Sequence, residues 1–364
     1  MTAGWARATG LLLGAVADAA FGDPRRGHPV AGFGAVAAGR ERRAYADRRG
    51  AGIRHVAVLF GGVVALGTAL ERTARRPVAR ALVTGLTTWT VLGGTSLARE
   101  GAALAEELNE SDLAAARRRL PSLCGRDPAA LDVAGLARAG TESMAENTSD
   151  AVVAPLLWGA VAGIPGLLGY RAVNTLDAMI GHRSPRYLRF GWAAARLDDV
   201  ANLVPARVCV LLVAGLAPLV GGSPGAALRT WRRDAAAHPS PNAGPVEAAA
   251  AGALGVTLGG RTVYPHGVDE RPRLGDGPPP GPDDLRRAAR LSRFVGVAAA
   301  LLAAGVAAAT AAQRRPYRSA SGVSPSGPGS WSSRSSSPAR ARRTAPRSVR
   351  RSPERRCRTS SRMK

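Results

Sequence analysis

The sequence predicts an all-α protein: a polytopic integral membrane helical bundle with extramembrane helices and loops, followed by a disordered C-terminal tail. Three observations predict this class. Apolar runs recur along the 364 residues, and each long run approaches the roughly 20 residues that a helix needs to cross a bilayer. The runs are rich in Gly and Ala, whose small side chains let helices pack closely in lipid. Charged residues gather between the runs, where loops would lie.

The apolar runs predict the membrane helices in order. The longer runs cover residues 55–70, 81–98, 151–170, 204–222 and 294–312, and a weaker run covers 8–21. The weaker run resembles a signal peptide, but Asp18 interrupts it, and we interpret it as a first helix that stays in the protein. The chain would therefore cross the membrane four to six times. A soluble all-α protein with Ala-rich buried helices would show a similar pattern and is the alternative.

The polar segments predict the extramembrane parts. Residues 40–54 form an Arg-rich charged loop, and such loops favour the cytoplasmic side of a membrane. Residues 99–140 carry an Ala-rich amphipathic pattern that two prolines interrupt, which predicts two or three extramembrane helices. Residues 223–293 form a second polar region, which includes a Pro- and Gly-rich loop at 271–282.

The positive charge is concentrated at the C-terminal end. The formal net charge is +24, and residues 314–364 hold 15 Lys and Arg against the single acid Glu354. This Ser/Arg/Pro-rich segment cannot bury enough apolar surface to offset its ordering entropy, so we predict that it is disordered. It does not interleave aromatic residues with its charges, and we expect no nucleic-acid partner. We divide the chain into a membrane-embedded catalytic domain, 1–313, and a tail, 314–364.

Three polar clusters beside the apolar runs predict a functional site. They are Glu142, Glu146 and Asp150; Asn174 and Asp177; and Arg196, Asp198, Asp199, Asn202 and Arg207. Members of the first two clusters are three or four residues apart, so each cluster would share one helix face. Like charges at that spacing repel, and arginine partners or a divalent cation would explain them. A solvated helix end would explain any one cluster, but ionisable groups at membrane depth mark a site by default.

The chemistry of these clusters favours magnesium over zinc. Carboxylate-rich sites suit Mg²⁺, which keeps waters and usually bridges to phosphate. Cys124, Cys209 and Cys357 are far apart, which excludes a zinc site or a disulfide scaffold.

Two further stretches fit the binding of an anion. "GDPRRGHPV" contains Asp23 and His28, and "HPSPNAG" contains His238, Ser240 and Asn242 before an Ala-rich helix. The N-terminus of such a helix can bind an anion through free backbone N–H groups. No Walker A sequence is present, so the spacing predicts no particular ATP site.

Five stretches together resemble the cobalamin-biosynthesis membrane proteins of the CbiB/CobD type, the adenosylcobinamide-phosphate synthases. The stretches are "GDPRRGHPV", "ESMAENTSDAVVAPLLW", "YRAVNTLDAMIGHR", "RYLRFGWAAARLDDVANLVPAR" and "HPSPNAGPVEAAAAGALG". Their order and spacing match over residues 10–312. Such proteins commonly read N-[SA]-G-W-P-E where this chain has "NAGPVE", without the Trp, so the geometry of this loop can differ here.

The resemblance implies a reaction in cobalamin (vitamin B12) biosynthesis. It implies an ATP-dependent carbon–nitrogen ligase that converts adenosylcobyric acid to adenosylcobinamide phosphate, by joining aminopropanol or its O-phosphate to a corrin propionate carboxylate. The cofactors would be ATP and Mg²⁺. The partners would be the corrinoid, the amine, the lipid bilayer and other membrane enzymes of the pathway. The protein would be a multi-pass protein of the inner (cytoplasmic) membrane, with its active site facing the cytoplasm.

The resemblance and the clusters together suggest roles for individual residues. An amide ligase must activate a carboxylate, usually as an acyl phosphate, and Mg²⁺ and Arg would stabilise the phosphoryl charge at a partly dry site. The amine needs a base, for which His182, His238 or a buried carboxylate would serve. We assign catalysis to Glu142, Glu146, His182, Arg196 and His238; metal binding to Asp150, Asp198 and Asp199; and substrate binding to Asp23, His28, Asn147, Arg171, Asn174, Asp177, Arg183, Asn202, Arg207, Ser240 and Asn242.

Two other functions are alternatives. A Mg-dependent membrane transferase of the prenyl or CDP-alcohol type also uses acidic clusters, but "LDDVAN" supplies only the first two acids of a D-D-x-x-D motif. A membrane transporter with intramembrane carboxylates predicts inverted repeats, and the sequence shows no corresponding halves.

Overall fold

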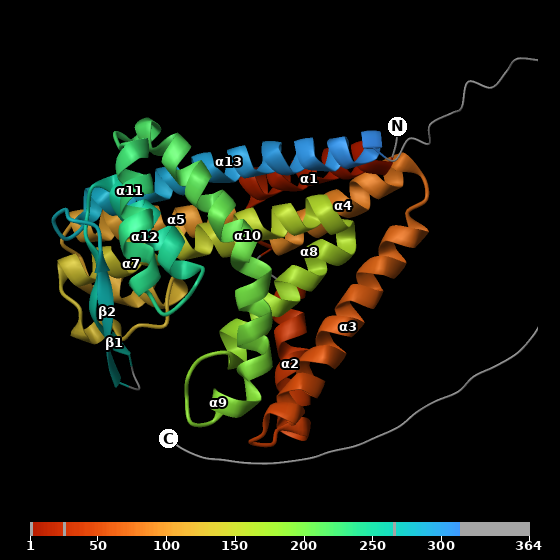
Figure 1. Cartoon of the computed structure of the whole chain (residues 1–364), viewed down its shortest axis with the longest axis horizontal. Coiled ribbons are helices and arrows are strands. Elements are labelled where there is room, and N and C mark those ends of the chain that lie inside the picture. Colours follow the sequence, from red (N-terminus) through yellow and green to blue (C-terminus); the bar gives the residue numbers. More distant parts are fainter. Residues whose placement is uncertain (1–2, 25–26, 265–266, 314–364) are drawn as a thin grey trace, which may run out of the picture. The chain divides into compact units, whose positions relative to one another are not determined.

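The computed structural model describes residues 3–24, 27–264 and 267–313, and most of these are helical (Figure 1). The predicted disorder of residues 314–364 lies outside the described residues. The helices are α1 (Ala3–Phe21), α2 (Pro29–Ala44), α3 (Arg49–Thr73), α4 (Pro77–Val91), α5 (Gly94–Asn109), α6 (Leu113–Arg119), α7 (Val133–Thr148), α8 (Ala154–Ile180), α9 (Tyr187–Phe190), α10 (Trp192–Leu216), α11 (Pro224–Asp234), α12 (Ala243–Leu254) and α13 (Pro282–Gln313).

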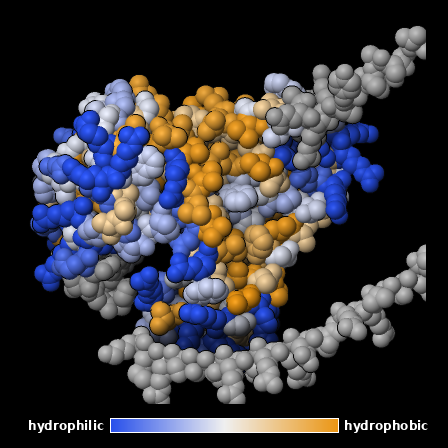
Figure 2. Space-filling view, viewed as in Figure 1, coloured by the Kyte–Doolittle hydropathy of each residue, from blue (hydrophilic) through white to orange (hydrophobic). Residues whose placement is uncertain are grey.

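The predicted all-α membrane bundle is confirmed. Within the described residues, four segments are long and apolar enough to cross a membrane: Arg49–Thr73, Val133–Ile180, Trp192–Val220 and Pro282–Thr310. Figure 2 shows apolar side chains gathered over the region of α3, α8 and α10, with hydrophilic surface over α11 and α12. Many large apolar side chains therefore face outwards, as the lipid-facing side of a membrane helix does.

The apolar run at 81–98 does not form a single span. Helix α4 ends at Val91, and α5 begins at Gly94 after an extended Leu92. A residue distant in the sequence contacts the start of α5: the buried Asp18 of α1 accepts hydrogen bonds from the backbone N–H and the hydroxyl of Thr95, both 3.0 Å long. Asp18 thus supplies an acceptor for the first turn of α5.

The extramembrane helices predicted for 99–140 are present, but a hairpin in the second polar region was not predicted. Helices α5, α6 and α7 cover most of the first region. Strands β1 (Leu258–Tyr264) and β2 (Gly267–Leu274) pair antiparallel, with Leu258 opposite Leu274. Both leucines are completely buried. The strands carry few other apolar residues, so their alternation was too weak to predict them, and the first residues of the expected loop at 271–282 belong to β2.

Helices α7 and α8 form one continuous path with two irregularities. The first is a π-helical segment, Ser149–Val153, between the two helices. The second is a break at Gly163, whose φ of 69° and ψ of −146° are open essentially to glycine alone. At the break Arg7 donates to the carbonyl oxygens of Ala160 and Val161, both at 3.2 Å, and to Glu71 at 3.0 Å. Arg7 of α1 thereby satisfies backbone carbonyl groups near the break, and Glu71 of α3 accepts a hydrogen bond from Arg7.

Candidate active site

A cavity of about 880 Å³ lies where the π-helical segment meets the end of α8, the start of α10 and the start of α12. Its walls carry carboxylates, arginines and amides together. The carboxylates are Glu146, Asp150, Asp177, Asp198 and Asp199, and the arginines are Arg49, Arg183, Arg189, Arg196 and Arg271. Opposite charges from segments distant in the sequence therefore share one cavity, which suits a substrate that carries both signs of charge.

The π-helical segment helps to bring the carboxylates together. Asp150 lies in this segment, where the wider turn changes the direction of the following side chains, as π-bulges commonly do at functional sites. Asn174 donates to Asp150 at 3.4 Å across the gap to α8. On α10, Asn202 donates to one oxygen of Asp198 at 2.9 Å and accepts from the hydroxyl of Tyr170 at 2.8 Å. A hydrogen-bonded layer therefore links α8 and α10 behind the carboxylates.

One carboxylate oxygen of Asp198 is available to bind a ligand. Its Oδ1 atom is buried and has no hydrogen-bond partner within the described part of the chain. Asp199, its neighbour, pairs with Arg196 at 3.1 Å. Among the described residues, no three His, Cys, Asp or Glu side chains come close enough to hold a metal ion by themselves. Mg²⁺ is commonly held by one or two carboxylates together with waters and substrate phosphate, and the Asp198 oxygen fits that mode.

The segment from His238 to Asn242 is tied to α10 and to α12. The backbone N–H of Ser240 donates to Nδ1 of His238 at 3.1 Å. The hydroxyl of Ser240 accepts from the backbone N–H groups of Asn242 and Ala243. Asn242 accepts from Arg207 at 2.9 Å and donates to the carbonyl of Asp199 at 2.7 Å. These first N–H groups of α12 are therefore already occupied, and the prediction that they are free to bind an anion is wrong for them.

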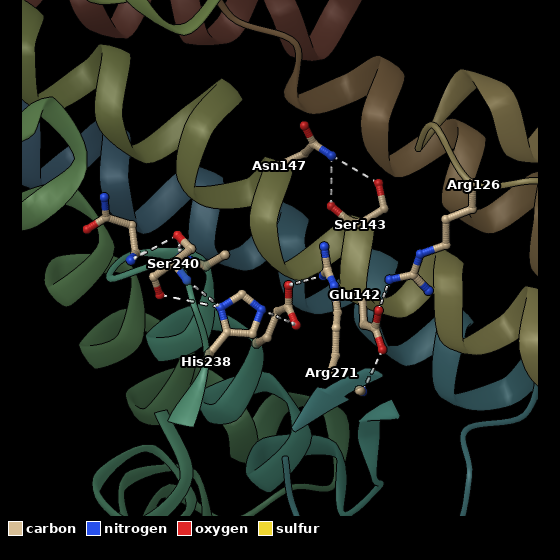
Figure 3. Close-up of polar contacts among 11 residues, drawn as sticks. Arg126, Glu142, Ser143, Asn147, His238, Ser240 and Arg271 are labelled. Atoms are coloured by element: carbon tan, nitrogen blue, oxygen red, sulfur yellow. Dashed lines mark hydrogen bonds and ion pairs between the residues drawn. The ribbon is translucent and has the colours of Figure 1, made fainter. Parts of the chain in front are cut away.

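A buried network of charged groups lies next to this segment (Figure 3). Arg126 pairs with Glu142, which also accepts from the backbone N–H of Gly259 at 2.7 Å. Arg271 stands between Glu142 and His238 in Figure 3, and its guanidinium lies 3.8 Å from Glu247. Burial raises the pKa of Glu247 well above its usual range, and the negative charges of Glu142 and Glu146 add to the shift.

A second cavity, of about 300 Å³, joins this network to the larger cavity. It is lined by Arg126, Glu142, Asn147 and Asn174, among others. It shares Glu146, Asp150, Asp177 and Arg271 with the larger cavity. The two cavities therefore meet along one wall of carboxylates, with Arg271 of β2 reaching both.

The sequence matches the family described as "CobD/Cbib protein" over residues 11–292. The chain belongs to the CobD/CbiB family. It is 61% identical over 299 residues to "Cobalamin biosynthesis protein CobD" of Mycobacterium tuberculosis (strain ATCC 25618 / H37Rv), which covers 82% of this chain and 95% of that protein. Proteins of the same name from Rhodobacter capsulatus and Chromobacterium violaceum are 44% and 43% identical, over 76% and 77% of this chain and 90% of each relative. No solved structure matches the chain.

Membership of the CobD/CbiB family gives this chain a role in cobalamin biosynthesis, and its structure brings most of the predicted site residues together. The larger cavity is lined by Glu146, Asp150, Asp177, His182, Arg183, Arg196, Asp198, Asp199, Asn202, His238, Ser240 and Asn242. The smaller cavity adds Glu142, Asn147 and Asn174.

Four predicted residues lie outside both cavities in this CobD/CbiB chain. His28 caps α2 by accepting from the backbone N–H of Val30 at 3.2 Å, so its position has a structural explanation. Arg207 donates a hydrogen bond to the side chain of Asn242. Arg171 is partly buried and interacts electrostatically with Asp23 and Asp150. Residues 25 and 26 of the same motif as Asp23 lie outside the described residues.

Sequence reasoning missed several charged residues of the site. Arg126 comes from the segment between α6 and α7, and Arg271 comes from the unpredicted strand β2. Neither stands at helical spacing from the acidic residues that it approaches, so no local pattern could identify it. Glu247 could have been identified from the sequence, because it belongs to the "NAGPVE" stretch on which the resemblance to the CobD/CbiB family partly rests.

Proposed function

We propose that the chain is the ATP-dependent amide ligase of this pathway, which joins aminopropanol or its O-phosphate to a propionate carboxylate of adenosylcobyric acid. The observation that carries the proposal is the cavity of about 880 Å³ in which carboxylates and arginines face each other at the ends of apolar helices. The corrinoid and the phosphates are anionic, and the amine is cationic. A site for joining them needs both kinds of partner.

The arginines would hold the anionic groups. Arg183, Arg189 and Arg196 line the cavity, and the latter two are well exposed at its mouth, with about two thirds of their side chains accessible. A guanidinium binds carboxylate or phosphate through two parallel hydrogen bonds, which fixes the direction of the bound group. The propionate to be activated would thus be oriented before reaction, which removes much of the entropic barrier.

The carboxylates would receive the amine and its proton. The amine arrives protonated, and Glu146 and Asp177 are placed on the wall that the two cavities share. In the bond-forming step the amine nitrogen attacks the activated acyl carbon, the carbon–oxygen bond to the departing phosphate breaks, and the nitrogen loses its proton to a carboxylate. His238 is a weaker candidate for this base, because its Nδ1 already accepts a hydrogen bond from Ser240 and its Nε2 faces Glu247.

Asp150, Asp198 and Asp199 would hold Mg²⁺, with the unpartnered Oδ1 of Asp198 as the clearest fit. When bound, the ion would offset the charge of the phosphates. The proposed location is the cytoplasmic membrane, with the cavity open to the cytoplasm where ATP is present. The Arg-rich segment at 40–54, predicted as a loop, comprises the end of α2, a short connection and the first turns of α3, and its charge supports that orientation.

The reaction can be tested directly with the full chain reconstituted in lipid nanodiscs. Adenosylcobyric acid, Mg²⁺ and ATP are supplied with either aminopropanol or its O-phosphate, and the products are followed by mass spectrometry. The proposal expects a corrinoid product heavier by the amine minus one water, formed only when ATP is present. Formation of that product without ATP, or ATP-independent transport of corrinoid with no new amide, would contradict it.

A further inference from the structure

A separate pocket of about 550 Å³ lies between the end of α2 and the start of α3. None of its lining residues lines either of the cavities of the candidate active site. Four arginines contribute to it: Arg40, Arg43, Arg48 and Arg54. Four arginines from two helices and their linker thus line one pocket, which favours an anionic occupant.

The neighbouring carboxylates do not neutralise these arginines. Glu41 is engaged by Arg186, at 2.9 Å, and Asp47 is engaged by Arg189, at 3.5 Å. Within the described part of the chain, none of the four arginines forms an ion pair with a carboxylate. The Nε atom of Arg40 is buried and has no hydrogen-bond partner among those residues. A buried donor of this kind normally has an acceptor, and here the acceptor would come from a ligand.

The pocket continues into an apolar wall on the membrane side. Ala57 and Val58 of α3 complete its lining, and Val58 is 54% exposed. Helix α3 is a candidate membrane span, and only 22% of its apolar 18-residue stretch is buried inside the protein. The arginines therefore stand where α3 enters the apolar part of the bilayer, and Val58 faces the region that acyl chains would fill. A small soluble anion would make no favourable contact with such an apolar wall.

We propose that this pocket binds one anionic phospholipid of the membrane. The headgroup phosphodiester would accept hydrogen bonds from the arginines, and an acyl chain would run along Ala57 and Val58. Basic pockets between membrane helices recognise anionic headgroups in this way. The occupant is a lipid, because the pocket combines cationic and apolar walls at the membrane boundary. The proposal is independent of the ligase reaction.

The test uses the full chain purified in an uncharged detergent, with phosphatidylglycerol and phosphatidylcholine of identical acyl chains as probes. Binding is measured by native mass spectrometry over a lipid titration. The expected result is one phosphatidylglycerol bound at least about tenfold more tightly than phosphatidylcholine. The triple variant Arg43→Gln, Arg48→Gln, Arg54→Gln should lose this preference. Circular dichroism and thermal unfolding establish that the variant is folded.

The matched control is Arg72→Gln, Arg75→Gln, Arg76→Gln, which removes the same charge from exposed positions at the opposite end of α3. It should keep the preference for phosphatidylglycerol. Equal binding of the two lipids by the unmodified chain would overturn the proposal. An equal loss of binding in both triple variants would do so too, because it would show a general charge effect. Displacement of the lipid by equimolar inorganic phosphate would instead assign the pocket to a soluble anion.

Discussion

The Nε2 atom of His238 lies 3.9 Å from a carboxylate oxygen of Glu247, and both side chains are almost completely buried. The other ring nitrogen of His238, Nδ1, lies 3.1 Å from the backbone N–H of Ser240 and 3.4 Å from its carbonyl oxygen, which leaves Nε2 facing Glu247. This arrangement fixes the orientation of the ring at the edge of the larger cavity. His238 of the segment before α12 and Glu247 of α12 therefore face each other in the protein interior.

Replacing Glu247 by Gln should change how stability depends on pH. The pKa of Glu247 in the folded protein is raised above its usual value near 4.5, so the folded state keeps a proton that the unfolded state releases. Stability of the unmodified chain should therefore fall as pH rises from about 4.5 towards the folded pKa. Glu247→Gln removes this contribution. The thermal stability of the variant in detergent, relative to that of the unmodified chain, should therefore increase as pH rises over that interval.

Asp234→Asn provides a control of opposite sign. The Arg233 guanidinium, 2.6 Å away, lowers the pKa of Asp234, and the backbone N–H of Gly275 adds to the shift. This carboxylate therefore contributes stability above its unfolded pKa, and the contribution is lost as pH falls through the lower folded pKa. The variant should lose stability at neutral pH and approach the unmodified chain in acid. Parallel pH profiles for Glu247→Gln and the unmodified chain would show that Glu247 does not retain its proton.

Replacing Arg271 by Gln should lower the rate of amide formation by on the order of 100-fold. Arg271 reaches both cavities, where it faces the carboxylates and would orient an anionic substrate group. Arg271→Lys should recover only part of the rate, because an ammonium cannot form two parallel hydrogen bonds. The measurement is kcat and KM for each substrate, per folded molecule.

Arg273→Gln is the matched control, because Arg273 is exposed on the same strand and lines neither cavity. It should keep normal kinetics. If both variants lose activity to the same extent, strand β2 contributes only as a support.

Replacing Asp198 by Asn should lower the rate by about 100-fold or more, which corresponds to about 2.7 kcal/mol. The substitution keeps the size of the side chain but removes the charge that a hard cation needs. We expect a smaller loss for Asp199→Asn, because Asp199 pairs with Arg196 whereas Asp198 has an unpartnered oxygen. Amide formation is measured per folded molecule across a titration of Mg²⁺, and the midpoint should move to higher concentration.

Asp283→Asn serves as the reference for that titration. Asp283 pairs with Arg286 three residues later, as Asp199 pairs with Arg196 from three residues before, but its side chain is 84% exposed and outside both cavities. Its rate and midpoint should match those of the unmodified chain. An unchanged midpoint in Asp198→Asn as well would remove Asp198 from the proposed metal ligands.

Replacing Gly163 by Ala should destabilise the protein by about 1–3 kcal/mol, because its backbone conformation is strained for any residue with a Cβ. An added Cβ would also come within 2.7 Å of the Glu71 carboxylate. Thermal unfolding in detergent measures the effect. Gly61→Ala on α3 is the control, since its Cβ would meet nothing within 4 Å, and it should be neutral or slightly stabilising. Equal stability of the two variants would mean that the stability of the protein does not depend on the helix break at Gly163.

Removing residues 317–364 should leave membrane insertion and amide formation nearly unchanged. This segment carries no motif of the family, and the family match ends at residue 292. The comparison is made between full-length and shortened chains at equal amounts of inserted protein. A shortened chain that inserts but forms no amide would show that the tail takes part.

The sequence could predict what depends on local pattern. The apolar runs gave the candidate spans, and the i, i+4 spacing of Glu142, Glu146 and Asp150 placed acids beside the cavities. It could not predict what depends on distant partners. The start of α5 contacts Asp18 of α1, and the carboxylates beside the acidic wall pair with Arg126 and Arg271. A long-range hydrogen bond or ion pair leaves no periodicity in the chain, so these features appear only in three dimensions.

The contact of Arg7 with Glu71 has a consequence for how the chain is made. During synthesis α1, α2 and α3 emerge in that order, and the carbonyl groups of Ala160 and Val161 follow much later. In that interval Glu71 can already neutralise Arg7, at the 3.0 Å distance of the finished protein. Arg7 and Glu71 would then add no net charge to α1 and α3 before the later helices are inserted. An unpaired charge in the bilayer has a high free energy. Assembly of this end of the bundle can thus proceed in the order in which the helices leave the ribosome.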